Sequence, residues 1–265
     1  MALEQHREFV NRAIDRFQRD PRIMGIAAGG SWITQSMDEF SDIDLVIAVA
    51  PEYEAEVSRE RLTMAEQLGK VLAAFTGEHV GEPRLLICLY GPPLLHVDLK
   101  FVGLQDLAHR VEDPVILWQR DEALATALAG GEPRYPQPDR QWIEDRFWVW
   151  VHYITVKIGR GELFEAIEML SYLRQTVLGP LALLGRGKLP RGVRYLERDA
   201  PAEAAQLQRT IAAHNPLDCA LALQEAIALY RQLREHTPGL VLRREAEEQV
   251  RLYLDSIMER LKHGL

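Results

Sequence analysis

Three aspartates, Asp42, Asp44 and Asp98, are the residues of this sequence best placed to do chemistry. Asp42 and Asp44 flank the first residue of the apolar stretch Ile43–Val49, where large aliphatic side chains recur at every second position. Side chains two apart on a β-strand share a face, so both carboxylates point the same way. Asp98 repeats this pattern within Leu94–Val102. On neighbouring strands, these three carboxylates would form a cluster that needs protons or cations.

Magnesium is the cation that such a cluster suits. Proteins hold this hard ion through a few carboxylates, and phosphate oxygens fill the remaining positions. We therefore expect Asp42, Asp44 and Asp98 to be both the metal ligands and the catalytic residues. For the Asp-x-Asp pair taken alone, solvated acids at a strand end are the alternative.

A Gly29-Gly30-Ser31 triplet stands eleven residues before the aspartate pair. Glycines allow a phosphate to approach the backbone closely, and a helix starting near Ser31 would offer free N–H groups and a favourable dipole. The Ser31 hydroxyl would add one more polar contact. A tight turn followed by a helix N-cap is the alternative for this triplet.

Together these motifs resemble the DNA polymerase beta-like nucleotidyltransferase superfamily, and within it the bacterial aminoglycoside and lincosamide nucleotidyltransferases (adenylyltransferases). The resemblance rests on Gly29-Gly30-Ser31, Ser41-Asp42-Ile43-Asp44-Leu45-Val46-Ile47 and His96-Val97-Asp98-Leu99-Lys100. It implies transfer of a nucleoside monophosphate, AMP from ATP first of all, to a hydroxyl of a small molecule, with pyrophosphate as the leaving group. It also implies a role in antibiotic resistance.

The resemblance assigns roles residue by residue. It implies that Asp42 and Asp44 bind the metals, and that Asp98 completes the metal site or acts as general base. Gly29, Gly30, Ser31 and Ser41 are the implied nucleotide-binding residues. Two cations bridging the phosphates would stabilise both the attacking and the leaving oxygen.

The general base has several candidates. A hydroxyl needs a proton acceptor within hydrogen-bond reach, and the candidates for this role are Asp98, Glu144, Asp145 and His96. We interpret His96 as a strand-face residue without a catalytic role. Lys157 continues an apolar helical stripe and resembles the lysine of the antibiotic transferases that reaches the triphosphate, so we expect it to bind nucleotide. A lysine that snorkels to solvent is the alternative.

The first half of the chain alternates helical and strand patterns. Helices are predicted at Glu4–Gln18 and near Glu54–Phe75. The predicted strands are Arg22–Ala28, Ile43–Val49, Arg84–Tyr90 and Leu94–Val102. We expect them to form a mixed or antiparallel sheet.

Gly and Pro are concentrated between residues 129 and 138, as is typical of a linker. Beyond it only helical periodicity is found, at Trp142–Ile158, Glu162–Leu178, Ala202–Ala213, Leu217–Glu235 and Arg243–Lys262. The predicted fold is therefore α/β (α+β). A mixed sheet flanked by helices is expected in residues 1–132 and an all-α bundle in residues 133–265. The resemblance implies that the first is the nucleotidyltransferase catalytic domain and the second the substrate-binding domain.

Composition narrows the class of protein. The 265 residues carry a net charge of −8, which argues against general nucleic-acid binding. Residues 1–130 hold 12 basic and 21 acidic side chains, an excess that suits a metal site and an aminoglycoside-like cation, with solubility as the alternative. We expect no membrane span and no secretory signal, and hence a cytoplasmic protein. Cys88 and Cys219 are expected to be buried thiols.

Two other functions stay open. One is a nucleotide-sensing or partner-binding protein on the same fold, similar to the antitoxin-like relatives of the superfamily. The other is an adenylyltransferase that acts on a protein or an RNA end. If the protein is a nucleotidyltransferase, we expect its partners to be an NTP and a small hydroxylated acceptor. The sequence does not identify the acceptor, the NTP base or the oligomeric state.

Overall fold

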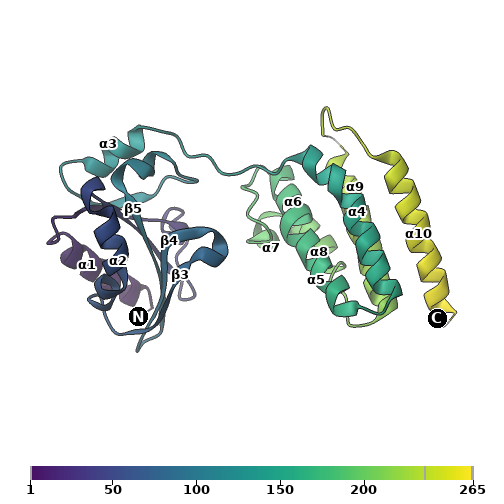
Figure 1. The fold of residues 1–265 in the computed structure, drawn as a ribbon, viewed down its shortest axis with the longest axis horizontal. Coiled ribbons are helices and arrows are strands. Elements are labelled where there is room, and N and C mark those ends of the chain that lie inside the picture. Colours follow the sequence, from purple (N-terminus) through teal and green to yellow (C-terminus); the bar gives the residue numbers. More distant parts are fainter. Residues whose placement is uncertain (1, 236, 264–265) are drawn as a thin grey trace. The chain divides into compact units, whose positions relative to one another are not determined.

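The chain folds into two compact units, Met1–Tyr135 and Pro136–Leu265, seen in a computed structural model (Figure 1). The structure describes residues 2–235 and 237–263. Each unit has its own hydrophobic core. The expected combination of a mixed sheet flanked by helices with a helical second half is confirmed.

A six-stranded sheet in the order β3-β4-β5-β2-β1-β6 forms the centre of the N-terminal unit. Strands β2 and β5 pair in parallel, and the other neighbouring pairs are antiparallel. The strands are β1 (Ile23–Ala28), β2 (Ile43–Val49), β3 (Val71–Gly77), β4 (Glu82–Tyr90), β5 (Leu95–Gly103) and β6 (Val115–Gln119).

One face of the sheet is fully covered by the core. Helices α1 (Ala2–Phe17) and α2 (Glu54–Glu66) contribute Phe9, Phe17 and Met64 to this core. Alternate residues of the strands complete it, namely Ile43, Leu45, Ile47, Leu86, Cys88, Tyr90, Val97 and Leu99. The alternation predicted for Ile43–Val49 and for the Asp98 strand is therefore confirmed. Cys88 and Cys219 are both free and buried, as expected.

Among the described residues of the N-terminal unit, a core covers the opposite face of the sheet at one end only. A smaller core there joins Ala48 and Val102 to Leu107 and Leu124, which come from a short 3₁₀ turn, Leu104–Ala108, and from helix α3 (Ala123–Ala129). Asp44 and Asp98 lie on this same face, outside that core. We call the part that carries them the open face.

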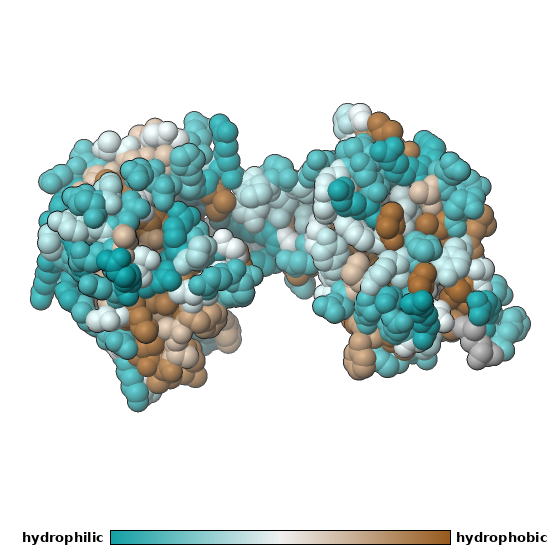
Figure 2. Space-filling model, viewed as in Figure 1, coloured by the Kyte–Doolittle hydropathy of each residue, from teal (hydrophilic) through white to brown (hydrophobic). Residues whose placement is uncertain are grey.

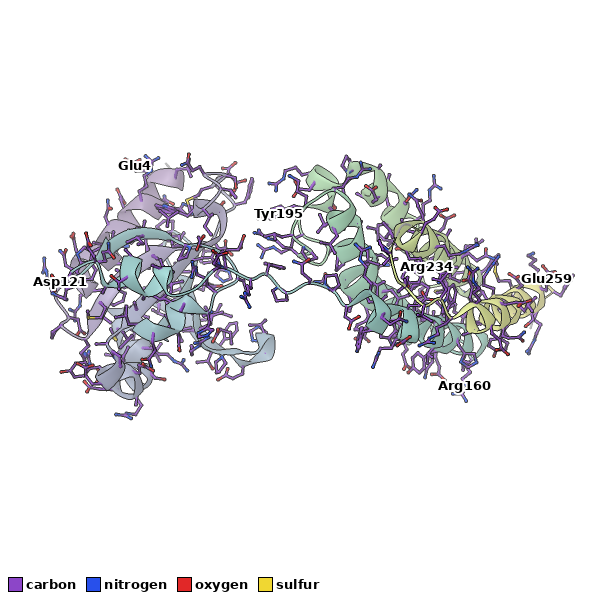
Figure 3. The ribbon with its side chains drawn as sticks, turned by 90° about the horizontal axis from the view of Figure 1, so that it is seen from above. Glu4, Asp121, Arg160, Tyr195, Arg234 and Glu259 are labelled. Atoms are coloured by element: carbon purple, nitrogen blue, oxygen red, sulfur yellow. The ribbon has the colours of Figure 1, made fainter. Side chains whose placement is uncertain are left out.

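The described part of the C-terminal unit contains helices joined by loops and no strand. Its core gathers side chains from α4, α5 and α9, among them Phe147, Leu170 and Leu223. The helices are α4 (Arg140–Gly159), α5 (Leu163–Leu173), α6 (Gly179–Gly185), α7 (Leu196–Asp199), α8 (Pro201–Gln208), α9 (Pro216–Arg234) and α10 (Arg244–Lys262). A π-helical turn, Arg174–Leu178, joins α5 to α6. Figure 3 shows Arg234 among these helices, with Arg160 and Glu259 at the periphery.

Three expectations about the elements are wrong. The helix predicted to run to Phe75 ends at Glu66, and its last part is strand β3 instead. Strand β6 was not predicted. The helix expected near Ser31 is a three-residue 3₁₀ turn, Gly30–Trp32, so it has no extended helix dipole to offer a phosphate. Within residues 2–235 and 237–263, the structure has no helix long and apolar enough to cross a membrane.

Candidate functional site

Asp44 and Asp98 occupy matching positions on two neighbouring parallel strands. Asp44 on β2 is the Cα partner of Asp98 on β5, with Ile43 paired to Val97 and Leu45 to Leu99 on either side. Adjacent strands lie about 4.8 Å apart, and paired residues point to the same face. The two carboxylates predicted from sequence therefore project side by side from the open face.

Asp42 precedes β2 by one residue and lies close enough to act on this pair. Burial is the main reason why the pKa of Asp98 is raised, and the negative charge of Asp42 raises it further. Both effects disfavour the ionised carboxylate. The structure thus brings the three predicted acids into one electrostatic neighbourhood.

His96 contacts Asp98 directly, which the sequence interpretation of His96 as an inert residue did not anticipate. Its Nε2 lies 3.0 Å from Oδ1 of Asp98, and the pair points out of the open face. This contact lowers the pKa of Asp98, but less than burial raises it. The i, i+2 spacing of the two residues on one strand was the available evidence for the contact.

Gly30 lies against the carboxylate of Asp44. The residue has a φ of +55°, and a Cβ built on it would come within 2.0 Å of Oδ2 of Asp44. The N–H of Gly29 donates to the Asp44 carbonyl at 2.9 Å, which ties the loop to β2. The glycine pair and Asp44 are therefore direct neighbours in the structure.

Ser31 contributes a buried hydroxyl to the same loop. Within the described ranges, its Oγ is one of three buried side-chain polar atoms without a hydrogen-bond partner. Leaving a buried hydroxyl unsatisfied is unfavourable by about 1–3 kcal/mol, so such an atom calls for a ligand or water. This is an independent indication that the loop holds a polar group.

Ser41 anchors the end of the loop that enters β2. Its hydroxyl accepts from the N–H of Asp38 at 2.9 Å and donates to the Asp38 carboxylate at 3.0 Å. The Ser41 carbonyl lies 2.7 Å from Nε2 of His6, a buried residue of α1. In this structure Ser41 orders the loop before Asp42.

The donor set suits a hard divalent cation, although its side chains are not gathered around one point. Within residues 2–235 and 237–263, no group of three or more His, Cys, Asp or Glu side chains is arranged to hold a metal ion. Carboxylates repel one another in the absence of a cation. The residues still fit the predicted ion, because Asp44 and Asp98 offer carboxylate oxygens on the open face, with the glycine loop against Asp44.

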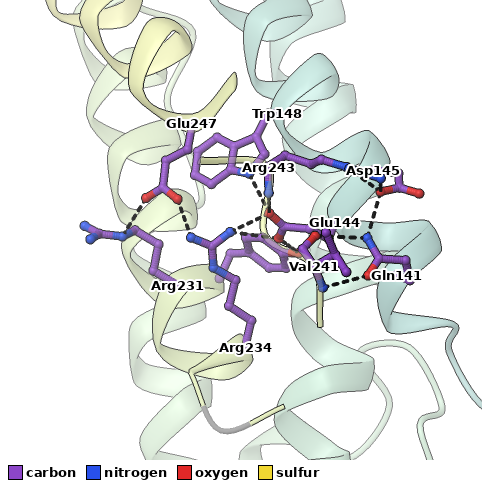
Figure 4. A network of polar contacts seen from close by, with 10 residues as sticks. Gln141, Glu144, Asp145, Trp148, Arg231, Arg234, Val241, Arg243 and Glu247 are labelled. Carbon is purple, nitrogen blue, oxygen red and sulfur yellow. Dashed lines mark hydrogen bonds and ion pairs between the residues drawn. The ribbon is translucent and has the colours of Figure 1, made fainter. Parts of the chain in front are cut away.

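Glu144 is not a candidate base, because it is sealed inside the helical unit. Its side chain is fully buried and accepts from Arg234 at 2.7 and 2.8 Å and from Tyr230 at 2.7 Å (Figure 4). Trp148 and the N–H of Arg243 donate to it as well. Burial opposes ionisation, but these hydrogen bonds hold the pKa of Glu144 below its usual value. The carboxylate is a structural anion.

Asp145 and Lys157 also have partners within the helical unit. Asp145 accepts from Gln141 at 2.8 Å and pairs with Arg243 at 2.7 Å. Lys157 forms ion pairs with Glu162 at 2.5 Å and Glu165 at 2.8 Å. The hydrogen bonds to these carboxylates raise the pKa of Lys157. The prediction that Lys157 binds a triphosphate stays a prediction, and it requires exchange of these partners for phosphate oxygens.

No protein-family model and no curated protein matches the chain. Several solved structures are similar to it, among them the following two. An aminoglycoside 6-adenyltransferase from Bacillus subtilis is 15% identical, with 93% of this chain and 96% of that chain covered and a TM-score of 0.39. A nucleotidyltransferase-like protein from Exiguobacterium sibiricum is 14% identical, with 95% and 89% covered and a TM-score of 0.36. At these values, neither likeness assigns an activity to this chain.

Proposed function

We propose that the protein is a metal-dependent nucleotidyltransferase that moves a nucleoside monophosphate, AMP from ATP first of all, to a hydroxyl of a small molecule. The observation that carries this proposal is the meeting of Asp44, Asp98 and Gly30 on the open face. Carboxylates alone suit a cation, and a glycine loop alone suits a phosphate. Both in contact suit a metal-bound nucleoside triphosphate.

Asp42 and Asp44 are the carboxylates that would hold Mg²⁺, and Asp98 is the acid beside them that is free to act as a base. When bound, two such cations neutralise the triphosphate and the charge that develops on the attacking and leaving oxygens. Gly29 and Gly30 bring the loop against Asp44, and we propose that the phosphates bind along this loop. The Ser31 hydroxyl, which lacks a partner among the described residues, donates to a phosphate oxygen. Ser41 orients the nucleotide loop through Asp38.

The transfer itself exchanges one bond to phosphorus for another. The acceptor oxygen bonds to the α-phosphorus, the bond from that phosphorus to the bridging oxygen breaks, and pyrophosphate leaves. Asp98 takes the hydroxyl proton in this proposal, because it belongs to the cluster while Glu144 is enclosed and Asp145 is paired with Arg243. We propose Lys157 as a further triphosphate contact from the helical unit.

Release of pyrophosphate tests this function. Purified protein is incubated with Mg²⁺ and each of the four NTPs, against a panel of aminoglycosides, lincosamides and simple polyols. Release that needs both Mg²⁺ and an acceptor, and that is lost in Asp42→Asn, supports the proposal. NTP binding without release from any acceptor would favour a sensing role instead.

A further inference from the structure

Apolar side chains lie beside the carboxylate pair of the open face, on the next two strands of the sheet. Asp98 is the cross-strand partner of Ile87 on β4, and Ile87 is the partner of Phe75 on β3. Asp44, Asp98, Ile87 and Phe75 thus form one straight row across four strands. At about 4.8 Å per strand, Phe75 stands roughly 10 Å from Asp98.

This part of the open face belongs to no core cluster of the described residues. Ile87 is half-buried, Leu89 is 39% exposed and Phe75 is 55% exposed. Leu89 is the partner of His96, so it stands beside the row at the same end of the sheet. We call Ile87, Leu89 and Phe75 the apolar platform. On the side of the N-terminal unit that Figure 2 shows, hydrophilic surface surrounds a brown, apolar area at the lower end of the unit.

The order of groups across the face gives the platform a role in the proposed reaction. Gly30 and Ser31 lie on the β1 and β2 side of Asp44, so the leaving pyrophosphate belongs there. Attack on the α-phosphorus is in line with the leaving group, from the opposite side. The acceptor hydroxyl therefore approaches from the β5 and β4 side, where Asp98 is followed by Ile87.

We infer that the apolar platform binds the body of the acceptor, and that this body is an apolar ring or chain that carries the reacting hydroxyl. The inference rests on the proposed nucleotidyl transfer and names its substrate class. Apolar side chains beside a charged cluster stabilise a ligand that matches both halves, because its apolar part leaves water while its hydroxyl meets Asp98.

The one acid on β4, the strand that carries Ile87 and Leu89, is already paired with cations of its own unit. Glu82, at the start of β4, is already paired with Arg84 at 2.7 Å and with Lys100 at 2.7 Å. These contacts lower the pKa of Glu82 to about 2, so it stays an anion held by its neighbours. The acid excess of this unit therefore does not extend to a free carboxylate on β4.

Two matched probes test the inference. Methyl β-D-glucoside and hexyl β-D-glucoside present the same sugar hydroxyls and differ only in the apolar chain. Their binding to the full chain, with Mg²⁺ and a non-hydrolysable ATP analogue, is measured by saturation-transfer NMR. The hexyl glucoside is expected to bind at least about tenfold more tightly than the methyl glucoside, because one added apolar contact increases affinity by roughly this factor.

Variants test whether the platform causes the difference in affinity between the two glucosides. Ile87→Ser and Phe75→Ser are expected to remove it, and Phe75 is exposed enough for its variant to fold even where Ile87→Ser does not. Phe164→Ser serves as control, since Phe164 is an 82% exposed aromatic residue of α5. Equal affinity for the two glucosides, no binding of either, or a preference that both platform variants retain would overturn the inference.

Pyrophosphate release separates this inference from the proposed function. Wild-type protein that releases pyrophosphate in an Asp42-dependent manner but shows no preference for the hexyl probe contradicts only the platform. Absence of any Asp42-dependent release contradicts the transfer, and the platform inference with it.

Discussion

The α-carbon of Gly30 lies directly against the carboxylate of Asp44. A Cβ on Gly30 would come within 2.0 Å of Oδ2, and the residue also has the left-handed φ of +55°. Two separate constraints, backbone conformation and side-chain space, therefore require glycine at this position. The Gly29–Ser31 loop and strand β2 are therefore closely fitted to each other at this point.

Gly30→Ala is expected to abolish transfer and to destabilise the N-terminal unit. The added methyl group must displace Asp44, beyond the roughly 1–2 kcal/mol that a left-handed alanine costs. Gly81→Ala is a matched control, because Gly81 has a φ of +75° and open space around its Cβ position. Thermal unfolding and pyrophosphate release of both variants check this, and equal behaviour of the two would contradict the contact.

Asp98→Asn is expected to make the protein more stable at pH 7. Burial, assisted by Asp42, raises the folded-state pKa of Asp98 above its unfolded value. The folded wild-type protein therefore binds this proton more tightly, and its stability falls as the pH rises through that folded pKa. Asparagine does not ionise, so the Asp98→Asn variant does not lose stability in this way as the pH rises.

Melting temperatures of wild type and Asp98→Asn between pH 4 and pH 8, without added metal, measure this effect. The advantage of the variant should shrink as the pH falls. Glu39→Gln removes an exposed acid from the loop before β2 and serves as control. A variant that is less stable than wild type at pH 7 would show that Asp98 is stabilised as an anion.

Arg234→Met is expected to destabilise the helical unit by about 3–5 kcal/mol, because it leaves Glu144 buried without its cation. Arg231→Met is the control, since Arg231 is half exposed in its pair with Glu247 and such pairs contribute about 0–1 kcal/mol. Urea unfolding of the two variants gives the comparison. A similar loss of unfolding free energy in both variants would mean that the buried network in Figure 4 contributes no more to stability than the exposed pair.

Lys157→Ala tests the proposed contact from the helical unit. If Lys157 contacts the triphosphate, the KM for the NTP should rise about tenfold or more, since a charged hydrogen bond contributes roughly 1.5–3 kcal/mol. Arg160→Ala is the control, because it also removes a cation beside Glu162. The Arg160 side chain is 65% exposed, and its Nη1 lies 3.6 Å from Oε1 of Glu162. An unchanged KM with reduced stability would show that Lys157 serves only its ion pairs with Glu162 and Glu165.

Alternation made the carboxylate site predictable from sequence. The strand Ile43–Val49 was predicted with the bounds that the structure has, and the aliphatic positions around Asp44 and Asp98 identify the face that both acids share. The parallel register that aligns them is a tertiary feature. The sequence prediction assumed that the two strands are neighbours, and only the structure shows that they pair in this register.

The errors have tertiary causes. Val71–Gly77 is apolar and contains two alanines, which suits a continued helix as well as a strand, and pairing with β4 decides between them. The 3₁₀ turn after Gly29 is too short to have a periodic pattern. Glu144 has the sequence context of an ordinary helical acid, and its enclosure depends on Arg234, 90 residues later.

Acceptor-dependent pyrophosphate release by wild type and Asp42→Asn, with Mg²⁺ and ATP, tests the central claim most directly. Asp15→Asn, at an exposed position of α1, is the matched control. The proposed metal site predicts that Asp42→Asn loses release by about 100-fold or more while circular dichroism and melting temperature stay close to wild type. Wild-type turnover in a folded Asp42→Asn protein would contradict it.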